Sequence, residues 1–336
     1  MPPRADPGVI SRASWRGRRV AVLGRAAFGA AVVVGLVLVV RGGGAALRHQ
    51  LVALGAGYGL LALLPVFAGT FVALLSWRAS LAAVGAELPL RSCLRVFLTT
   101  QLGKYVPGSV WPLVAQMQLG RAYGVSRSRM VTGGLVALGV SVVVASGLGL
   151  VVVPGLAGRG RLGTIVALAA VLAVVLGALV LRGGALGWLL DRGMRLLRRP
   201  ALEAPPDRRW LVRSIRWSLL TWALLGVHAA VLAYGLGGRG VTLLVAAAAF
   251  ALASAAGVLV VFVPAGAGVR EAVLVLLLQQ RLGLDGATAL ALVSRALLAA
   301  ADVLAAGVGV VAGSAAPPSA APAPEPHMPD TGSLSL

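Results

Sequence analysis

The sequence predicts an all-α polytopic membrane protein with about seven or eight transmembrane helices and two re-entrant segments built from broken helices. Three observations predict this class. Of the 336 residues, 59% are hydrophobic and only 12% are charged, whereas soluble domains carry roughly 25% charged residues. Several apolar runs have the length of about 20 residues that crosses the hydrocarbon core of a bilayer. Two further apolar stretches are interrupted by proline and glycine.

The predicted spans follow one another along most of the chain. They occupy residues 20–40, 51–77, 130–153, 162–181, 217–236, 241–263 and 287–312. These seven are a minimum, because residues 269–282 would add an eighth crossing if they pass through the bilayer. The side of the membrane that the C-terminus faces depends on this choice.

Basic residues predict the orientation of these spans. The chain carries 30 lysines and arginines against 10 acidic residues, a formal charge of +20. Most of the cations fall in alternate loops, and the positive-inside rule then places the N-terminus in the cytoplasm. The bilayer accounts for the charge, so we expect no nucleic-acid partner. The largest basic cluster, in residues 182–216, either binds anionic head groups of the cytoplasmic membrane or is a plain topogenic signal.

The ends of the chain and its few reactive side chains narrow the prediction further. We expect residues 1–19 to be a basic cytoplasmic N-terminus, residues 20–312 to be one transmembrane domain, and residues 313–336, rich in proline and alanine, to be disordered. Cys93 is the single cysteine, which excludes an intrachain disulfide and a cysteine-based metal site. Nucleotide-binding and hydrolase motifs are missing, so we expect no cofactor, no metal and no enzymatic activity. His228 makes a helix–helix hydrogen bond or, alternatively, relays a proton.

Residues 88–125 form the first predicted re-entrant segment. They are too apolar for a free loop, and basic residues flank them on both sides. Gly103, Pro107 and Gly108 interrupt the segment, which predicts two half-helices that enter the bilayer and return. Irregular backbone is tolerated at membrane depth only where protein or a wet cavity surrounds it.

Residues 263–284 form the second predicted re-entrant segment. Its breaks are Pro264, Gly266 and Gly268. A helix then begins, with Arg270 and Glu271 in its first turn. Both segments run through a break, an apolar half-helix, a glycine turn and a full span, which suggests an internal repeat of the kind that builds midplane sites in transporters. Because four predicted spans separate the copies, we expect both to enter from the cytoplasmic side.

Charged groups at these breaks and in the last span are candidate substrate-binding residues, because a charge at membrane depth is costly unless it is paired or hydrated. Lys104 either holds a lipid phosphate or simply lies at head-group level. Arg270 either binds phosphate or only snorkels, and Glu271 is expected to pair with Lys104 or Arg295. Arg295 and Asp302 lie two turns apart on one helix face, where they form structural ion pairs or line a polar path.

The two broken segments also carry a family resemblance. The residues that carry it are Gly103-Lys104-Tyr105-Val106-Pro107-Gly108 with Val110-Trp111 and Gly124-Val125-Ser126, and then Pro264-Ala265-Gly266-Ala267-Gly268-Val269-Arg270-Glu271 with Gly283-Leu284 and Arg295. They resemble the transmembrane region of lysylphosphatidylglycerol synthetase, a flippase-like multi-pass family that occurs both fused and stand-alone. The family pattern has glycine where Ala265 stands. The resemblance covers about residues 20–312.

The resemblance implies a domain of the cytoplasmic membrane that moves anionic phospholipids or lipid-linked substrates between leaflets, or helps to move them. Fused members carry a cytosolic aminoacyl transferase, which we do not expect here. The expected partners are membrane lipids, through anionic head groups or lipid phosphates. The alternative is a non-transporting scaffold for a glycosyltransferase or another envelope-lipid enzyme. The expected substrate-binding residues are Lys104, Tyr105, Pro107, Gly108, Arg270, Glu271, Arg295 and Asp302.

Overall fold

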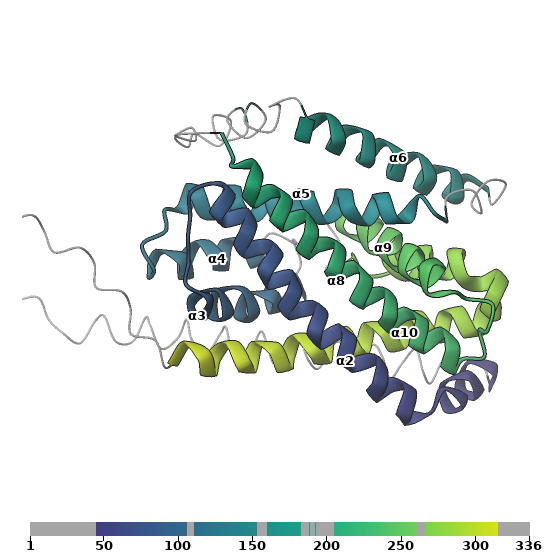
Figure 1. Cartoon of the computed structure of the whole chain (residues 1–336). Helices are drawn as coiled ribbons and strands as arrows, with labels where there is room; N and C mark the ends of the chain where they lie inside the picture. Colours follow the sequence, from purple (N-terminus) through teal and green to yellow (C-terminus); the bar gives the residue numbers. More distant parts are fainter. Residues whose placement is uncertain are drawn as a thin grey trace, which may run out of the picture.

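Helices make up every regular element in the part of the chain that the computed structural model describes, residues 45–105, 111–152, 160–182, 188, 192, 205–260 and 266–314 (Figure 1). The long helices are α2 (Ala45–Ala83), α5 (Arg127–Gly149), α6 (Gly160–Arg182), α8 (Arg208–Gly235), α9 (Leu243–Leu259) and α10 (Val269–Ser314). Between α2 and α5 lie the short elements α3 (Leu90–Cys93), the π-helical turn η1 (Leu94–Leu98), the 3-10 turn η2 (Gln101–Tyr105) and α4 (Trp111–Arg121).

These helices confirm the predicted class of an all-α polytopic membrane protein. Among the described residues, four stretches are long and apolar enough to cross a bilayer, and α9 and part of α6 are shorter apolar helices. The four are His49–Ala83, Arg127–Gly149, Arg208–Gly235 and Val269–Ala312. Each predicted span from residue 51 onward coincides with one of the long helices. The predicted span 20–40, the segment 1–19 and most of the predicted tail, residues 315–336, lie outside the described residues.

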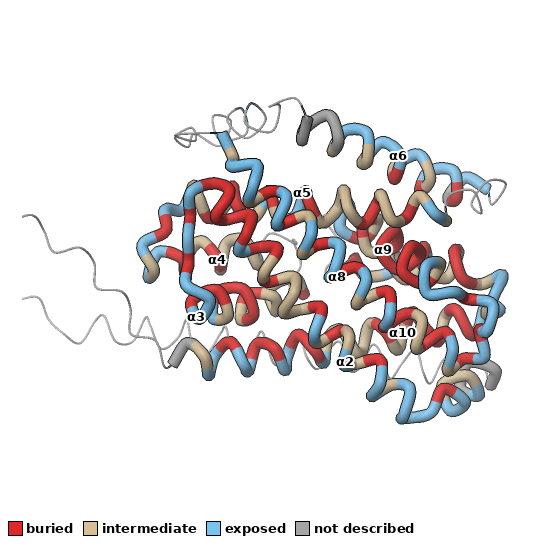
Figure 2. Tube along the Cα trace, viewed as in Figure 1, coloured by how far each residue is buried: buried red, intermediate tan, exposed pale blue. Residues whose placement is uncertain are grey.

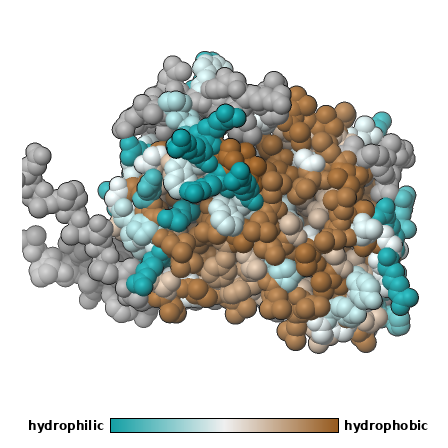
Figure 3. All heavy atoms as spheres, viewed as in Figure 1, coloured by the Kyte–Doolittle hydropathy of each residue, from teal (hydrophilic) through white to brown (hydrophobic). Residues whose placement is uncertain are grey.

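One end of the helix bundle gathers arginines, and we call it the basic end. α2 ends there and α8 begins there, because Ser76 Oγ donates to Ser214 O at 2.9 Å and Asp207 N donates to Ala83 O at 2.8 Å. Its arginines include Arg78, Arg121, Arg127, Arg129, Arg208, Arg209 and Arg213. At the opposite end, Leu54 and Tyr58 of α2 pack around Gly235 of α8. Figure 3 shows an apolar band between the hydrophilic residues of the two ends.

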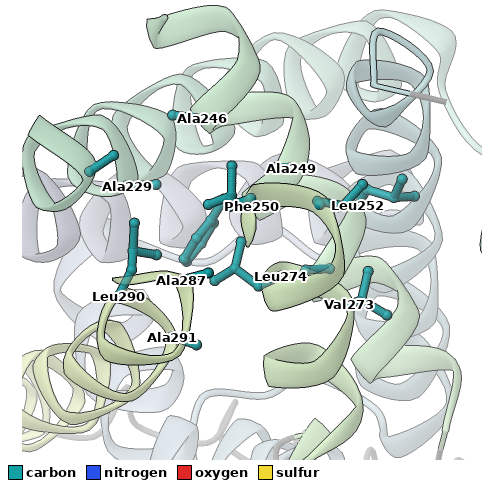
Figure 4. Close-up of a cluster of buried hydrophobic side chains, with 14 of the residues drawn as sticks. Ala229, Ala246, Ala249, Phe250, Leu252, Val273, Leu274, Ala287, Leu290 and Ala291 are labelled. Carbon is teal, nitrogen blue, oxygen red and sulfur yellow. The ribbon is translucent and has the colours of Figure 1, made fainter. Parts of the chain in front are cut away.

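The largest hydrophobic core joins α8, α9 and α10. Phe250 of α9 is 1% exposed and lies at its centre, beside Leu274 and Leu290 of α10 (Figure 4). Small residues let the helices approach: a Cβ on Gly226 of α8 would lie only 2.3 Å from Cβ of Ala247. Close packing of small residues drives helix association in membranes, where lipid is as apolar as the helices themselves.

α6 lies at the edge of the bundle, packed on α5 (Figures 1 and 2). Its outward side chains are apolar and open, among them Ile165 at 62%, Leu168 at 65% and Leu172 at 57% exposure. Such a face suits a helix whose surroundings are hydrocarbon, and Figure 2 shows α6 as mostly exposed and intermediate residues.

α10 consists of two antiparallel arms joined at Gly283, where φ is +71° and ψ is 168°. Arg295 Nη1 lies 2.8 Å from Glu271 Oε1. A continuous helix would separate two residues 24 apart by about 36 Å, so the chain reverses between them. We call residues 269–282 the first arm and residues 284–314 the second arm. The predicted glycine turn at Gly283 is therefore present.

α9 and the first arm form a hairpin, the second hairpin, that enters from the opposite end. Near the end of α9, a Cβ on Gly257 would lie 3.1 Å from Cβ of Arg270. Before the start of α9, a Cβ on Gly238 would lie 2.3 Å from Leu282 Cδ2. The first arm thus returns along α9 to the end where α9 begins. The expectation that both broken segments enter from one side is wrong, because α9 is a hairpin arm and not a separate crossing.

Residues 90–105 and 111–121 are the two described arms of the first hairpin, which enters from the basic end. Its outer part packs on the last turns of α10, where a Cβ on Gly309 would lie 3.0 Å from Leu94 O. Its two arms touch deeper in the bundle, where a Cβ on Gly103 would lie 2.9 Å from Pro112 N. The second arm of α10 therefore runs along both hairpins. The predicted breaks Pro107, Gly108 and Pro264 lie outside the described residues.

Candidate functional site

The two hairpins reach the second arm of α10 from opposite ends, and charged side chains join them to it. Lys104 and Tyr105 of the first hairpin contact Asp302, and Glu271 of the second contacts Arg295. Seven residues separate the two contacts on the helix, a rise of about 10 Å. We call Lys104, Tyr105, Arg270, Glu271, Arg295 and Asp302 the charge cluster.

Asp302 is the most buried charge of the cluster, with 3% of its side chain exposed. Lys104 Nζ lies 2.8 Å from Oδ2 and 3.0 Å from Oδ1, and the Tyr105 hydroxyl donates to Oδ2 at 2.5 Å. A carboxylate leaves water at high cost unless a cation and hydrogen bonds compensate it. Lys104 remains 33% exposed, so it is the accessible partner of this pair.

Glu271 has two partners and links the second hairpin to α10. Its Oε1 lies 2.8 Å from Arg295 Nη1, and its Oε2 accepts from the Gly268 N–H at 2.6 Å. The second contact satisfies a backbone donor at the start of the first arm, where a negative charge is also favoured by the helix dipole. The expectation that Glu271 pairs with Lys104 or Arg295 thus resolves to Arg295.

Arg270 is held without a carboxylate in direct contact within the described residues. Its Nη2 donates to Ser294 Oγ at 3.0 Å, and its Cζ lies 4.7 Å from the centre of the Phe250 ring. Its Nε is buried and has no hydrogen-bond partner in the part of the chain that the structure describes. Both carboxylates of the cluster act on it only electrostatically. A half-buried guanidinium whose buried Nε–H lacks a hydrogen-bond partner among the described residues is a strong candidate for binding an anion.

A chain of hydrogen bonds runs from Arg270 through Ser294 to His228. His228 is fully buried; its Nδ1 lies 2.9 Å from Ala62 O and its Nε2 lies 2.9 Å from Ser294 Oγ. A carbonyl only accepts, so Nδ1 carries the proton and Nε2 accepts from the Ser294 hydroxyl, whose oxygen accepts from Arg270. Of the two interpretations of His228, a helix–helix hydrogen bond or a proton relay, the structure therefore shows the hydrogen bond. Ser294 was missed, because a serine in an apolar span gives no signal of its own.

The structure brings six of the eight predicted site residues together, and Pro107 and Gly108 lie outside the described residues. Three cations, Lys104, Arg270 and Arg295, face the two carboxylates of Glu271 and Asp302, which leaves one positive charge in excess. In the described part of the chain, no group of three or more histidine, cysteine and acidic side chains could hold a metal ion.

Comparison with known proteins adds one finding. The family model of the lysylphosphatidylglycerol synthase TM region matches residues 26–306. This stretch contains both hairpins and the whole charge cluster. The chain matches no curated protein.

Proposed function

We propose, from the premise that this chain belongs to the lysylphosphatidylglycerol synthase transmembrane-region family, that it moves an anionic phospholipid or lipid-linked phosphate across the cytoplasmic membrane, or facilitates that movement. The observation that carries the proposal is the charge cluster. It lies where two hairpins from opposite ends meet, and it holds an excess of one positive charge.

The chemistry of the cluster matches a phosphate group. A phosphodiester carries a single negative charge, which neutralises the excess and offers oxygen acceptors to the open Nε of Arg270 and to Lys104. The acyl chains then stay in the bilayer while the head group passes between the hairpins. A site between broken helices at membrane depth is a recurring arrangement in transporters.

We propose no catalysis at this site. Both carboxylates are engaged by a cation and a second hydrogen bond, so neither is free to act as a general base. No nucleotide-binding motif occurs in the sequence, and we therefore propose that transport runs downhill or is coupled to an ion gradient.

The test is lipid exchange in proteoliposomes. Purified protein is reconstituted with labelled anionic, zwitterionic or polyprenyl-phosphate lipids, and exchange between leaflets is measured for wild type, Lys104→Ala and Arg270→Ala. Both variants should slow exchange of the anionic lipid about 10- to 100-fold, because a hydrogen bond to a charged group contributes about 1.5–3 kcal/mol. The matched controls are Arg121→Ala on α4 and Arg281→Ala on the first arm, both exposed arginines, which should exchange lipid at the wild-type rate.

Two results would contradict the proposal. The first is unchanged exchange in Arg270→Ala. The second is a folded wild type that exchanges no lipid, which would favour the alternative of a non-transporting membrane scaffold for a glycosyltransferase or another envelope-lipid enzyme. That alternative predicts a protein that co-purifies with the chain. Elution volume and thermal unfolding of each variant in detergent show whether it is folded.

A further inference from the structure

We infer that the two ion pairs of the charge cluster are two gates, and that a lipid phosphate opens each gate by replacing its carboxylate. Lys104/Asp302 closes the path from the basic end, and Arg295/Glu271 closes the path from the opposite end. The inference rests on the proposed function and deepens it, since it names the ligand chemistry and the order of events at the same site.

The topology of the hairpins gives each end of the bundle its own ion pair. Each hairpin enters from a different end of the bundle, and each is joined to the second arm of α10 by one ion pair. A phosphate that comes from the basic end meets Lys104 first, because the first hairpin enters there. A phosphate that comes from the opposite end meets the second hairpin, with Glu271 and Arg270 at the start of its first arm.

One helix position lies between the two ion pairs. Leu298 lies three residues after Arg295 and four before Asp302, so it occupies the same helix face, one turn from each. Its side chain is only partly buried. Leu298 packs at the edge of the large hydrophobic core. If the two ion pairs are gates, a cysteine at position 298 becomes reachable from the basic end only when Lys104/Asp302 opens, and from the opposite end only when Arg295/Glu271 opens.

Each ion pair exchanges partners when its gate opens. When Lys104 turns from Asp302 to a phosphate, Asp302 keeps the hydrogen bond from Tyr105. When Arg295 turns to a phosphate, Glu271 keeps the bond from the Gly268 N–H. Neither carboxylate is therefore left without a partner. Breaking a buried ion pair is costly mainly because it leaves a charge without one. Arg270, whose Nε is open, can hold the phosphate during both exchanges.

The charge of the cluster allows only one gate to open at a time. The cluster has one excess positive charge, so one phosphodiester neutralises it. Opening the second gate while the first is open would require a second anion, which would leave the cluster negative in a medium of low dielectric constant. A single lipid phosphate thus unlocks one end while the other stays closed.

The test is the accessibility of Leu298→Cys in a Cys93→Ser background. A membrane-impermeant maleimide is applied from either side of vesicles made of phosphatidylcholine. Arg121→Cys and Leu284→Cys mark the basic and the opposite side. Asp302→Asn should raise labelling of position 298 about tenfold from the basic side alone, and Glu271→Gln should do so from the opposite side alone. Lys104→Gln breaks the Lys104/Asp302 pair by removing its cation instead of its carboxylate. It is used in place of Asp302→Asn if that variant does not fold.

The ligand is tested in the same assay without the gate variants. Phosphatidylglycerol added to the vesicles should raise labelling of position 298 about tenfold over phosphatidylcholine alone. Phosphatidylcholine also carries a phosphodiester, but its choline cation cancels the charge. No rise with the anionic lipid would therefore overturn a phosphate of net negative charge as the ligand, and equal labelling from both sides in either gate variant would overturn the two gates. Lipid exchange together with equal labelling of position 298 from both sides would refute the two gates and leave the proposed function standing. Sided labelling without any lipid exchange would instead refute the proposed function.

Discussion

Gly266 and Gly257 set the distance between the break of the second hairpin and α9. Gly266 has a φ of +65°, and a Cβ built on it would lie 2.7 Å from Cα of Gly257. Two backbones therefore touch with no side chain between them, four residues before Arg270. This contact places the start of the first arm, and with it Arg270 and Glu271, at the depth of Ser294 and Arg295.

Gly266→Ala should destabilise the protein far more than Gly268→Ala. Both glycines have positive φ, +65° and +81°, which costs an alanine about 1–2 kcal/mol. Only at Gly266 would the new Cβ meet backbone; at Gly268 nothing lies within 4 Å. Overpacking adds about 1–3 kcal/mol at Gly266. Thermal unfolding in detergent measures the difference, and equal shifts in Tm would contradict the close approach.

At the level of residues, the sequence predicted the charged members of the site but only part of their pairing. Ionisable groups are rare in apolar helices, so Arg295 and Asp302 stand out by type alone. Lys104 and Asp302 lie 198 positions apart, and no local pattern brings such residues together. Ser294 could be found only through its contacts with His228 and Arg270.

At the level of elements, the first hairpin is docked by the last turns of α10. A Cβ on Gly309 would lie 3.0 Å from Leu94 O, 3.1 Å from Leu98 Cβ and 3.2 Å from Thr99 Cγ2. The same hairpin carries Lys104 a few residues further on. The fit of η1 against α10 therefore controls how close Lys104 comes to Asp302.

Gly309→Ala should loosen the first hairpin, whereas Gly307→Ala, two positions away on the same helix, should not. Nothing lies within 4 Å of a Cβ on Gly307, so alanine there should stabilise α10 by about 0.5–1 kcal/mol. Alanine at Gly309 should lower stability and speed amide hydrogen exchange in residues 94–105, because η1 must move away. A gain in stability for both variants would show that η1 does not depend on this contact.

α9 shows why hydropathy alone misplaced an element. The apolar run 241–263 is as long as a true span, yet its helix, Leu243–Leu259, has 17 residues, about 26 Å at 1.5 Å per residue. The chain then returns along the first arm. A hairpin arm that is buried on most sides has the same apolar composition as a crossing helix, so only tertiary contacts separate the two.

At the level of the whole molecule, the placement of α9 as a hairpin arm decides which parts of the chain lie at which end of the bundle. The second arm of α10 runs from Gly283 at the opposite end to the basic end, where Gly309 packs on η1. Arg281 belongs to the second broken segment, which was expected to enter from the cytoplasmic side. It lies instead at the opposite end, next to Leu282, which packs near Gly238. In the described part of the chain, Arg78, Arg121, Arg127, Arg129, Arg208, Arg209 and Arg213 still gather at the basic end.

Sided labelling of single cysteines should reproduce this arrangement. In a Cys93→Ser background, Leu284→Cys and Gly240→Cys should react with an impermeant maleimide from one side of the membrane. Arg121→Cys and Arg209→Cys should react from the other side. All four positions are exposed, so differences report sidedness. If Leu284→Cys reacts from the same side as Arg121→Cys, the second hairpin enters from the basic end and this arrangement is wrong.

The different sequence separations of the two ion pairs also set an order for biogenesis. Glu271 and Arg295 are 24 positions apart, whereas Lys104 and Asp302 are 198 apart. The shorter pair can form as soon as α10 leaves the ribosome, so its charges enter lipid already neutralised. Lys104 has no carboxylate until α10 has been synthesised, and an unpaired cation is costly in hydrocarbon. We therefore expect the first hairpin, though made early, to be seated only after α10 has been synthesised.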